Sequence, residues 1–181
     1  LRAGFTDPDV RSVFVSYYLL QFFYYSAPFY VPLYLHSVIG IPWSTLGWVL
    51  SVVLIPFLLI EYPAGLVADR WLGDKELMVA GFVITGLALG LFAFVDISTP
   101  LLIIITLLAA TRVGVALVEA MTEGHFFRRV SERDAGMVSV FRMGRPFAAL
   151  TAPIVGSILL ALGGYWWLFM GCGIVVGVAG I

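Results

Sequence analysis

Residues 65–75 read GLVADRWLGDK and contain the end of one long apolar run and, from Asp69, a short polar break before the next run. The run before this break covers residues 45–68, and the run after it covers residues 77–96. Each run is long enough to cross a bilayer as a helix, since the ~30 Å hydrocarbon core requires about 20 residues. The stretch therefore predicts a tight turn at a membrane surface between two transmembrane helices.

Further apolar runs lie on both sides of this pair, and polar breaks separate them. The sequence predicts six transmembrane helices, at residues 11–35, 45–68, 77–96, 101–126, 135–162 and 165–181. Of the 181 residues, 61% are hydrophobic and 12% are charged, whereas soluble domains carry about 25% charged residues. We therefore expect an all-α integral membrane protein that forms a single transmembrane domain over residues 1–181.

The basic residues predict the orientation of this domain. Of the ten lysines and arginines, most lie at the N-terminus and at the second and fourth breaks: Arg2, Arg11, Arg70, Lys75, Arg128, Arg129 and Arg133. The first, third and fifth breaks contain none. Because basic loops stay in the cytoplasm, we expect both termini to be cytoplasmic in a multi-pass protein of the inner (plasma) membrane.

Composition and motifs exclude several classes of function. The net charge of −1 does not favour nucleic-acid binding. The single cysteine, Cys172, lies in an apolar run and predicts neither a disulfide framework nor a thiolate metal site. Neither a Gly-x-Ser-Gly serine with a deep histidine partner nor a His-Glu-x-x-His motif is present, so a membrane protease is not indicated. We expect no cofactor and no enzymatic activity.

The break at residues 65–75 resembles the signature loop of the major facilitator superfamily. That loop has a glycine, three residues, Asp-Arg, and then glycine and basic residues, which match Gly65, Asp69, Arg70, Gly73 and Lys75. One extra residue precedes Gly73, and Asp74 stands where a basic residue is usual. The resemblance implies that this loop is a gating motif, in which Asp69 accepts hydrogen bonds from the start of a helix in a partner half.

The resemblance extends over the whole chain as one six-helix repeat, and residues 61–65 and 112–123 look more like the C-terminal half. It implies secondary active transport of a small solute by alternating access. The carboxylates inside the predicted helices favour protons as the coupling ion. A complete transporter has two such repeats. The chain would therefore act as half of a twelve-helix transporter or as a homodimer, and the alternative is a structural or assembly half without transport activity.

Six ionisable residues fall inside the predicted helices, where charge is costly and indicates function: Glu61, Arg112, Glu119, Glu123, Arg142 and Arg145. The spacing of Arg112, Glu119 and Glu123, seven and then four residues, places these three on one stripe of a helix. Two interpretations remain open for Glu61 and Glu119. Each could form a structural salt bridge with Arg112 or Arg142, or one of them could bind and release the coupling proton.

The first predicted helix carries an aromatic and polar face. Its members recur at steps of three and four residues: Tyr17, Gln21, Tyr24 and Tyr25. Because several of these residues lie near the middle of the span, away from the interfaces where aromatic residues usually gather, they favour the wall of a substrate cavity. The alternative is helix packing, with the phenol hydroxyls bonded to neighbouring backbone.

Overall fold

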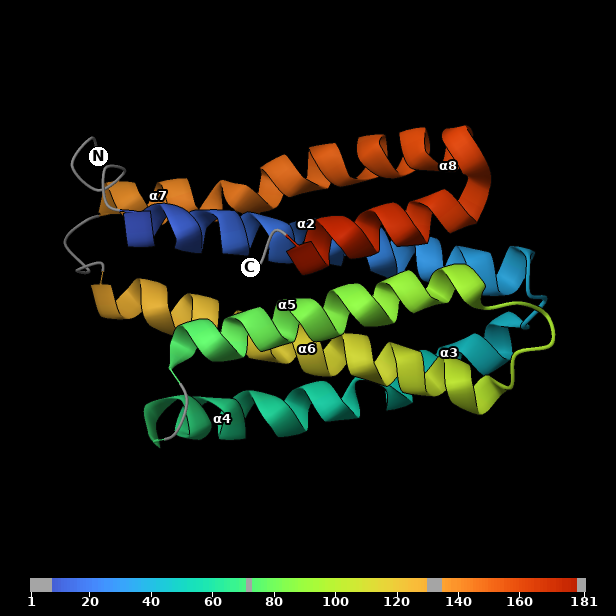
Figure 1. Ribbon diagram of the computed structural model, residues 1–181, viewed down its shortest axis with the longest axis horizontal. Coiled ribbons are helices and arrows are strands. Elements are labelled where there is room, and N and C mark those ends of the chain that lie inside the picture. Colours follow the sequence, from blue (N-terminus) through green and yellow to red (C-terminus); the bar gives the residue numbers. More distant parts are fainter. Residues whose placement is uncertain (1–7, 71–72, 130–134, 179–181) are drawn as a thin grey trace.

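The structure is a computed structural model that describes residues 8–70, 73–129 and 135–178. All regular secondary structure in these ranges is helical: α2 (Pro8–Ser37), α3 (Trp43–Val52), α4 (Ile55–Arg70), α5 (Asp74–Leu91), the 3-10 turn η1 (Phe92–Phe94), α6 (Leu101–Arg129), α7 (Ala135–Arg142) and α8 (Gly144–Val178). The helices form an elongated bundle whose members run roughly along its longest axis (Figure 1). The prediction of an all-α fold is confirmed.

Four helical segments of the described chain are long and apolar enough to cross a membrane. They cover Trp43–Ala68, Asp74–Phe94, Leu101–Gly124 and Gly136–Val178. Helix α2 is of similar length, but Gln21 and several serines and tyrosines interrupt its apolar sequence. The chain is therefore a membrane protein, as its composition predicts.

Helix α8 turns back on itself at a glycine pair. The backbone leaves the helical conformation at Gly163 (φ −164°, ψ 28°) and at Gly164 (φ 70°, ψ −161°). The conformation of Gly164 is accessible almost only to glycine, because a Cβ atom would clash with the backbone. We call residues 144–162 the first arm of α8 and residues 165–178 the second arm, which runs back beside the first (Figure 1).

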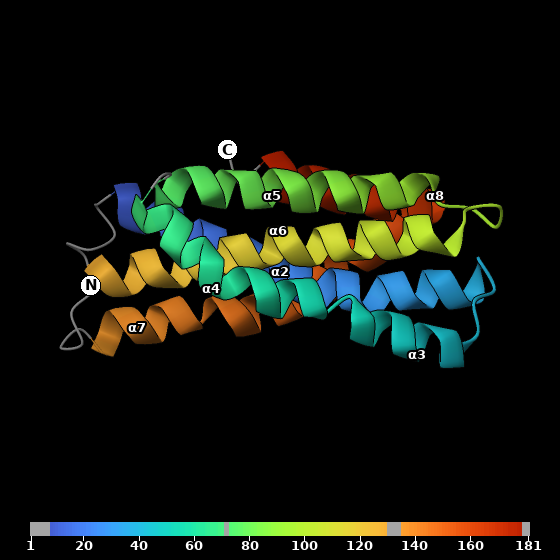
Figure 2. The same ribbon diagram turned by 90° about the horizontal axis from the view of Figure 1, so that it is seen from below.

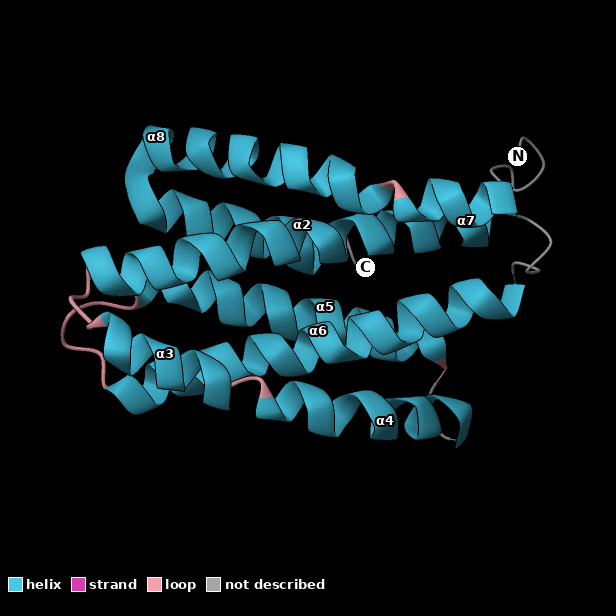
Figure 3. Ribbon diagram, turned by 180° about the vertical axis from the view of Figure 1, so that it is seen from behind, coloured by secondary structure: helices cyan, strands magenta, loops and turns pink. Residues whose placement is uncertain are grey.

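Two predicted helices are broken by proline. The predicted helix at residues 45–68 is divided between α3 and α4, and the predicted helix at residues 135–162 is divided between α7 and the first arm of α8 (Figure 3). Each break lies just before a proline, Pro56 or Pro146. Proline has no N–H group, and its ring clashes with the carbonyl four residues earlier. The same physical cause therefore explains both interruptions.

Helix α6 lies between α5 and α4 (Figures 1 and 2). Helix α5 packs against α6 on one side and α8 on another, while α2 packs mainly against α8 and also contacts α6. The loops at residues 38–42 and 95–100 lie at one end of the bundle together with the turn of α8 (Figure 3). Helix α6 and its neighbours thus form the framework that positions the charged residues.

Glycines bring α5 and the second arm of α8 into backbone contact. We call this contact the glycine seam and define it as Gly86, Gly90, Gly173 and Gly177. A Cβ atom on Gly86 would lie 2.7 Å from the carbonyl oxygen of Gly173, and a Cβ atom on Gly173 would lie 2.7 Å from the carbonyl oxygen of Gly86. Small residues allow this approach, which gains van der Waals contact where lipid provides no hydrophobic driving force.

Candidate functional site

The predicted ionisable residues differ in their exposure. Arg112 and Glu119 of α6 are half-buried, whereas Glu123 of α6, Arg142 of α7 and Arg145 of α8 are exposed. The side chains of Glu61, Asp69 and Arg70 lie outside the described part of the structure, although the backbone of all three belongs to α4.

Tyr24 and Glu119 join α2 to α6. The hydroxyl of Tyr24 donates a hydrogen bond of 2.5 Å to Oε2 of Glu119, and both side chains are half-buried. Hydrogen bonds to a charged acceptor are shorter and stronger than those between neutral groups. The structure thus brings a predicted cavity residue into contact with a predicted proton-coupling residue.

Gln21 and Arg145 join α2 to α8. Nε of Arg145 donates to Oε1 of Gln21 over 3.4 Å, and only 4% of the Gln21 surface is exposed. Tyr17, one turn earlier on α2, is also buried and lies near side chains of both charge signs: Arg145, Glu123, Glu119 and Arg142. We call this group, with Tyr17, Gln21 and Tyr24, the polar cluster.

An aromatic stack adjoins the polar cluster. The rings of Tyr17 and Phe141 stack with centroids 4.0 Å apart, and the ring of Phe126 stacks against Phe141 at 4.0 Å. Gly144 allows α8 to approach this stack, since a Cβ atom there would lie 2.9 Å from Cδ1 of Tyr17. The break between α7 and α8 is therefore packed directly against α2.

The four predicted cavity residues do not share one environment. Tyr17, Gln21 and Tyr24 belong to the polar cluster, whereas Tyr25 is 38% exposed. Successive residues of an α-helix point about 100° apart, so Tyr25 presents its ring to a different direction from Tyr24. Three of the four predicted residues therefore lie together, and the assignment of all four to a substrate cavity stays a prediction.

Arg112 lies apart from the polar cluster at the edge of a cavity. Its Nε atom is buried and has no hydrogen-bond partner among the described residues. The cavity has a volume of ≈ 150 Å³ and is lined by Arg112, Thr111 and apolar residues of α2, α3, α5, α6 and η1. Sequence reasoning selected Arg112 as a buried charge but gave no indication of the cavity beside it.

The gating motif is described only in part. Gly65 is half-buried within α4 and has open space where a Cβ atom would stand. Gly73 is the N-cap of α5, and Asp74 lies in the first turn of that helix, where the dipole favours an acidic residue. Lys75 is exposed. This placement at the start of a helix gives a physical reason for an acidic residue at position 74.

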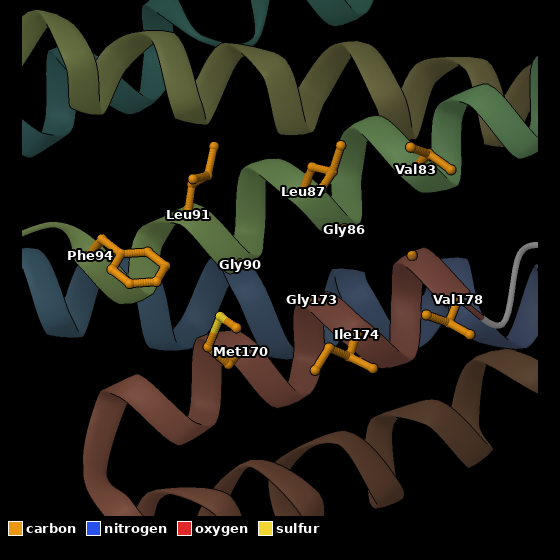
Figure 4. Close-up of a pocket in the computed structure, with 11 residues that line it drawn as sticks. Val83, Gly86, Leu87, Gly90, Leu91, Phe94, Met170, Gly173, Ile174 and Val178 are labelled. Carbon is orange, nitrogen blue, oxygen red and sulfur yellow. The ribbon is translucent and has the colours of Figure 1, made fainter.

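A cavity larger than the one beside Arg112 lies away from these charges. It is a groove of ≈ 380 Å³ between α5 and the second arm of α8, beside the glycine seam (Figure 4). Its rim carries exposed apolar side chains, including Leu87, Leu91 and Ile174. Because no charged residue lines it, this groove offers no means of holding a polar solute and is not the candidate site.

Two hydrogen bonds between α2 and the first arm of α8 were not predicted. The hydroxyl of Tyr18 bonds with Oγ1 of Thr151 at 2.6 Å, and the hydroxyl of Tyr30 donates to the carbonyl oxygen of Pro153 at 3.1 Å. Local sequence carries no signal for such pairs, since their members lie more than a hundred residues apart. These bonds hold α2 in place beside the polar cluster.

The described residues contain no group of three or more His, Cys, Asp or Glu side chains that could hold a metal ion. In a comparison of the sequence with models of known protein families, the model described as Major Facilitator Superfamily matches residues 12–181. No curated protein matches the chain. Members of this superfamily move solutes across membranes. The matched range covers nearly the whole chain and includes the loop at residues 65–75, the broken helices and the polar cluster, and the chain belongs to the major facilitator superfamily.

Proposed function

We propose that this chain transports a small solute by alternating access, as one six-helix half of a transporter. The observation that carries the proposal is the polar cluster, which gathers charges of both signs from α6, α7 and α8 beside three polar residues of α2. Charges on a membrane span face a bundle interior or a water-filled cavity, because hydrocarbon does not solvate them. The exposed side chains of Glu123, Arg142 and Arg145 would then face the solute pathway.

Glu119 is the proposed proton-coupling residue. As a carboxylate it accepts the hydrogen bond from Tyr24. When Oε2 is protonated, that oxygen becomes a weaker acceptor, and the contact between α2 and α6 weakens with it. Proton binding would thereby loosen a link between two helices, which is the kind of local change that can bias a two-state conformational equilibrium. Glu61, on the neighbouring helix α4, is the second candidate for this role.

The proposal includes pairing with a second six-helix unit, either another half or a second copy of the chain. Asp69 would approach the start of the helix pair α7 and α8 in the partner, and the two units would be related by an axis normal to the membrane. This arrangement also requires six crossings, with α8 providing the last two, and both termini in the cytoplasm. Cross-links between α5 and its counterpart in the partner would reject it.

Transport is tested by reconstituting the chain in vesicles that enclose a pH-sensitive dye. A panel of small sugars, amino acids and carboxylates is added with and without an imposed pH gradient. We expect at least one solute to acidify or alkalinise the interior, and Glu119→Gln to abolish this response. Glu76→Gln is the matched control, since Glu76 is exposed in the first turn of α5, away from the polar cluster.

The outcomes separate the alternatives. If solute enters but Glu61→Gln and Glu119→Gln both leave gradient-driven uptake unchanged, proton coupling by these residues is wrong while transport stands. If no solute enters and the chain elutes as a monomer in detergent, the structural or assembly alternative gains support instead.

A further inference from the structure

Arg112 presents a donor that the described protein does not satisfy. Its Nε atom is buried and lacks a hydrogen-bond partner. Glu119, the acid on the same stripe of α6, accepts its hydrogen bond from Tyr24 and lies seven residues away, or about 10 Å along the helix at ~1.5 Å per residue.

An unsatisfied guanidinium donor in a membrane span is expensive. Burying a polar group without a partner costs free energy, and the cost is higher when the group is charged. A purely structural role would be filled better by an apolar side chain, because leucine in the same place carries no such cost. The open donor is therefore understandable if a ligand with negative charge supplies the missing partner.

The guanidinium group of Arg112 indicates the chemistry of that ligand. Arginine binds a carboxylate with two parallel hydrogen bonds, and one of the two forks uses Nε together with one terminal nitrogen. Thr111, the other polar residue of the cavity, donates its hydroxyl proton to the carbonyl oxygen of Leu108 at 2.6 Å. The guanidinium group of Arg112 is thus the polar group left to bind a ligand in this cavity, and it suits one carboxylate group.

The cavity specifies the rest of the ligand. Its volume is ≈ 150 Å³, and apart from Arg112 and Thr111 it is lined by apolar side chains and backbone, with Phe23, Leu89 and Phe92 among them. An apolar cavity of about this size holds a benzene molecule. Pro28 and Leu54 on its margin are exposed, so the cavity opens to the surface between α2 and the end of α3.

We propose that Arg112 and this cavity form a binding site for a small monocarboxylate whose apolar body is about the size of a benzene ring. The site names a substrate class for the transport proposed above, and as a transport site it rests on that proposal. Arg112 lies on the same stripe of α6 as Glu119, the acceptor of the Tyr24 hydroxyl proton. A carboxylate on Arg112 and a proton on Glu119 would therefore act on the same helix.

The test measures equilibrium binding of radiolabelled benzoate to the purified full chain in lipid nanodiscs, which requires no flux. Benzamide has the same ring without the charge and should fail to displace the label. Arg112→Gln should weaken benzoate binding about tenfold to a hundredfold, as expected for loss of a charge-assisted hydrogen-bond pair. Arg11→Gln, at an exposed position near the start of α2, is the matched control and should bind benzoate as the unaltered chain does.

A second variant tests the cavity without removing the charge. Leu50 lines the cavity from α3, and Leu50→Ala should enlarge the cavity. The affinity for 4-ethylbenzoate should then rise relative to that for benzoate by about threefold or more, which corresponds to the burial of one or two methylene groups. This variant keeps the test informative if Arg112→Gln does not fold.

Three results overturn the site: equal displacement by benzamide and benzoate, unchanged benzoate binding in folded Arg112→Gln, or the same ring-size preference in Leu50→Ala as in the unaltered chain. Benzoate binding with the expected variant effects but without uptake into vesicles would support the site and contradict the transport proposal. Uptake of other solutes without any benzoate binding would support the transport proposal and contradict the site.

Discussion

The glycine seam and the polar cluster are two helix contacts of opposite chemistry in the same bundle. At the seam, α5 and the second arm of α8 meet through backbone atoms, with the carbonyl oxygen of Gly173 only 2.7 Å from where a Cβ atom of Gly86 would stand. At the polar cluster, α2 meets α6 and α8 through long side chains such as Tyr24 and Arg145. The backbones at the seam leave no space for a larger side chain, whereas the hydrogen bonds of the polar cluster can break and form again when side chains move.

The two contacts differ in how strongly they resist movement of one helix against another. Close backbone packing resists relative motion, because any shift costs many van der Waals contacts at once. Hydrogen bonds between flexible side chains can break and form again with little displacement of the helices. We therefore expect the glycine seam to be the fixed part of the bundle, and under the proposed function the polar cluster would be the part that responds to a solute or a proton.

The largest effect is expected from breaking the seam. Gly86→Leu places a side chain where the backbone of the second arm lies, so we expect little or no folded protein, since overpacking costs about 1–3 kcal/mol or more even where neighbours can adjust. Yield of monodisperse protein in detergent measures the effect. Gly47→Ala is the control, because a Cβ atom at Gly47 meets nothing within 4 Å, and it should stabilise α3 by up to about 1 kcal/mol. A well-folded Gly86→Leu protein would contradict the fixed role of the seam.

A smaller effect is expected at the polar cluster. Tyr24→Phe removes the donor to Glu119 and should destabilise the chain by about 1.5 kcal/mol, at the upper end for hydrogen bonds inside membranes. Tyr30→Phe removes a bond to a neutral carbonyl, that of Pro153, and should cost about 0.6 kcal/mol. Thermal unfolding in detergent gives both values. Equal losses would show that the charge of Glu119 adds nothing to its hydrogen bond with Tyr24.

The proline breaks test whether the polar cluster moves. Pro146→Ala supplies the missing N–H group for the carbonyl of Arg142, so α7 and α8 should join into one helix with a stability change within about 1 kcal/mol. We expect transport to slow while folding is retained. Pro153→Ala, in a part of α8 that is already continuous, should leave the rate unchanged. A rate that is the same in both variants would show that the break is static.

The smallest effect is expected in the loop between η1 and α6. Hydrogen bonds from Ser98 and Thr99 hold the pKa of the Asp96 carboxyl below its usual value of 3.8. Because the pKa of Asp96 is lower in the folded state than in the unfolded state, ionised Asp96 stabilises the loop fully at pH values above 3.8. This stabilisation is lost as the pH falls through the pKa of the folded state. Carbon-13 NMR of the Asp96 carboxyl should give a lower midpoint than in the Ser98→Ala/Thr99→Ala double variant. Identical midpoints would contradict the role of the two hydroxyls.

The sequence predicts helix positions well where the cause is local. The apolar run at residues 101–126 becomes α6, and the pair Gly163-Gly164 is the point where α8 reverses, because glycine alone adopts the backbone conformation required. Proline explains why α3 and α4 are separate, yet Pro153 lies inside a continuous α8. Whether a proline breaks a membrane helix depends on neighbours that satisfy the freed carbonyl, and the local sequence does not specify those neighbours.

The sequence selects the ionisable and polar residues of the candidate site as a prediction, but it does not specify which of them form pairs. Spacing placed Arg112, Glu119 and Glu123 on one stripe of α6, but it could not show that Tyr24 bonds to Glu119 while Arg112 borders a cavity. Helices in lipid lack the amphipathic pattern that indicates which face meets a neighbour. The contacts follow from how α2 is held beside α6 and α8, which depends on residues far apart along the chain.

The turn at Gly163 and Gly164 has a mechanical consequence. A connection of two residues has no slack, and the arms it joins also touch along their length, since a Cβ atom on Gly171 would lie 2.9 Å from Cδ1 of Leu159. The first arm carries Arg145, and the second arm carries Gly173. A shift of the first arm at Arg145 would therefore have to carry the second arm with it, against the backbone contact between Gly173 and α5.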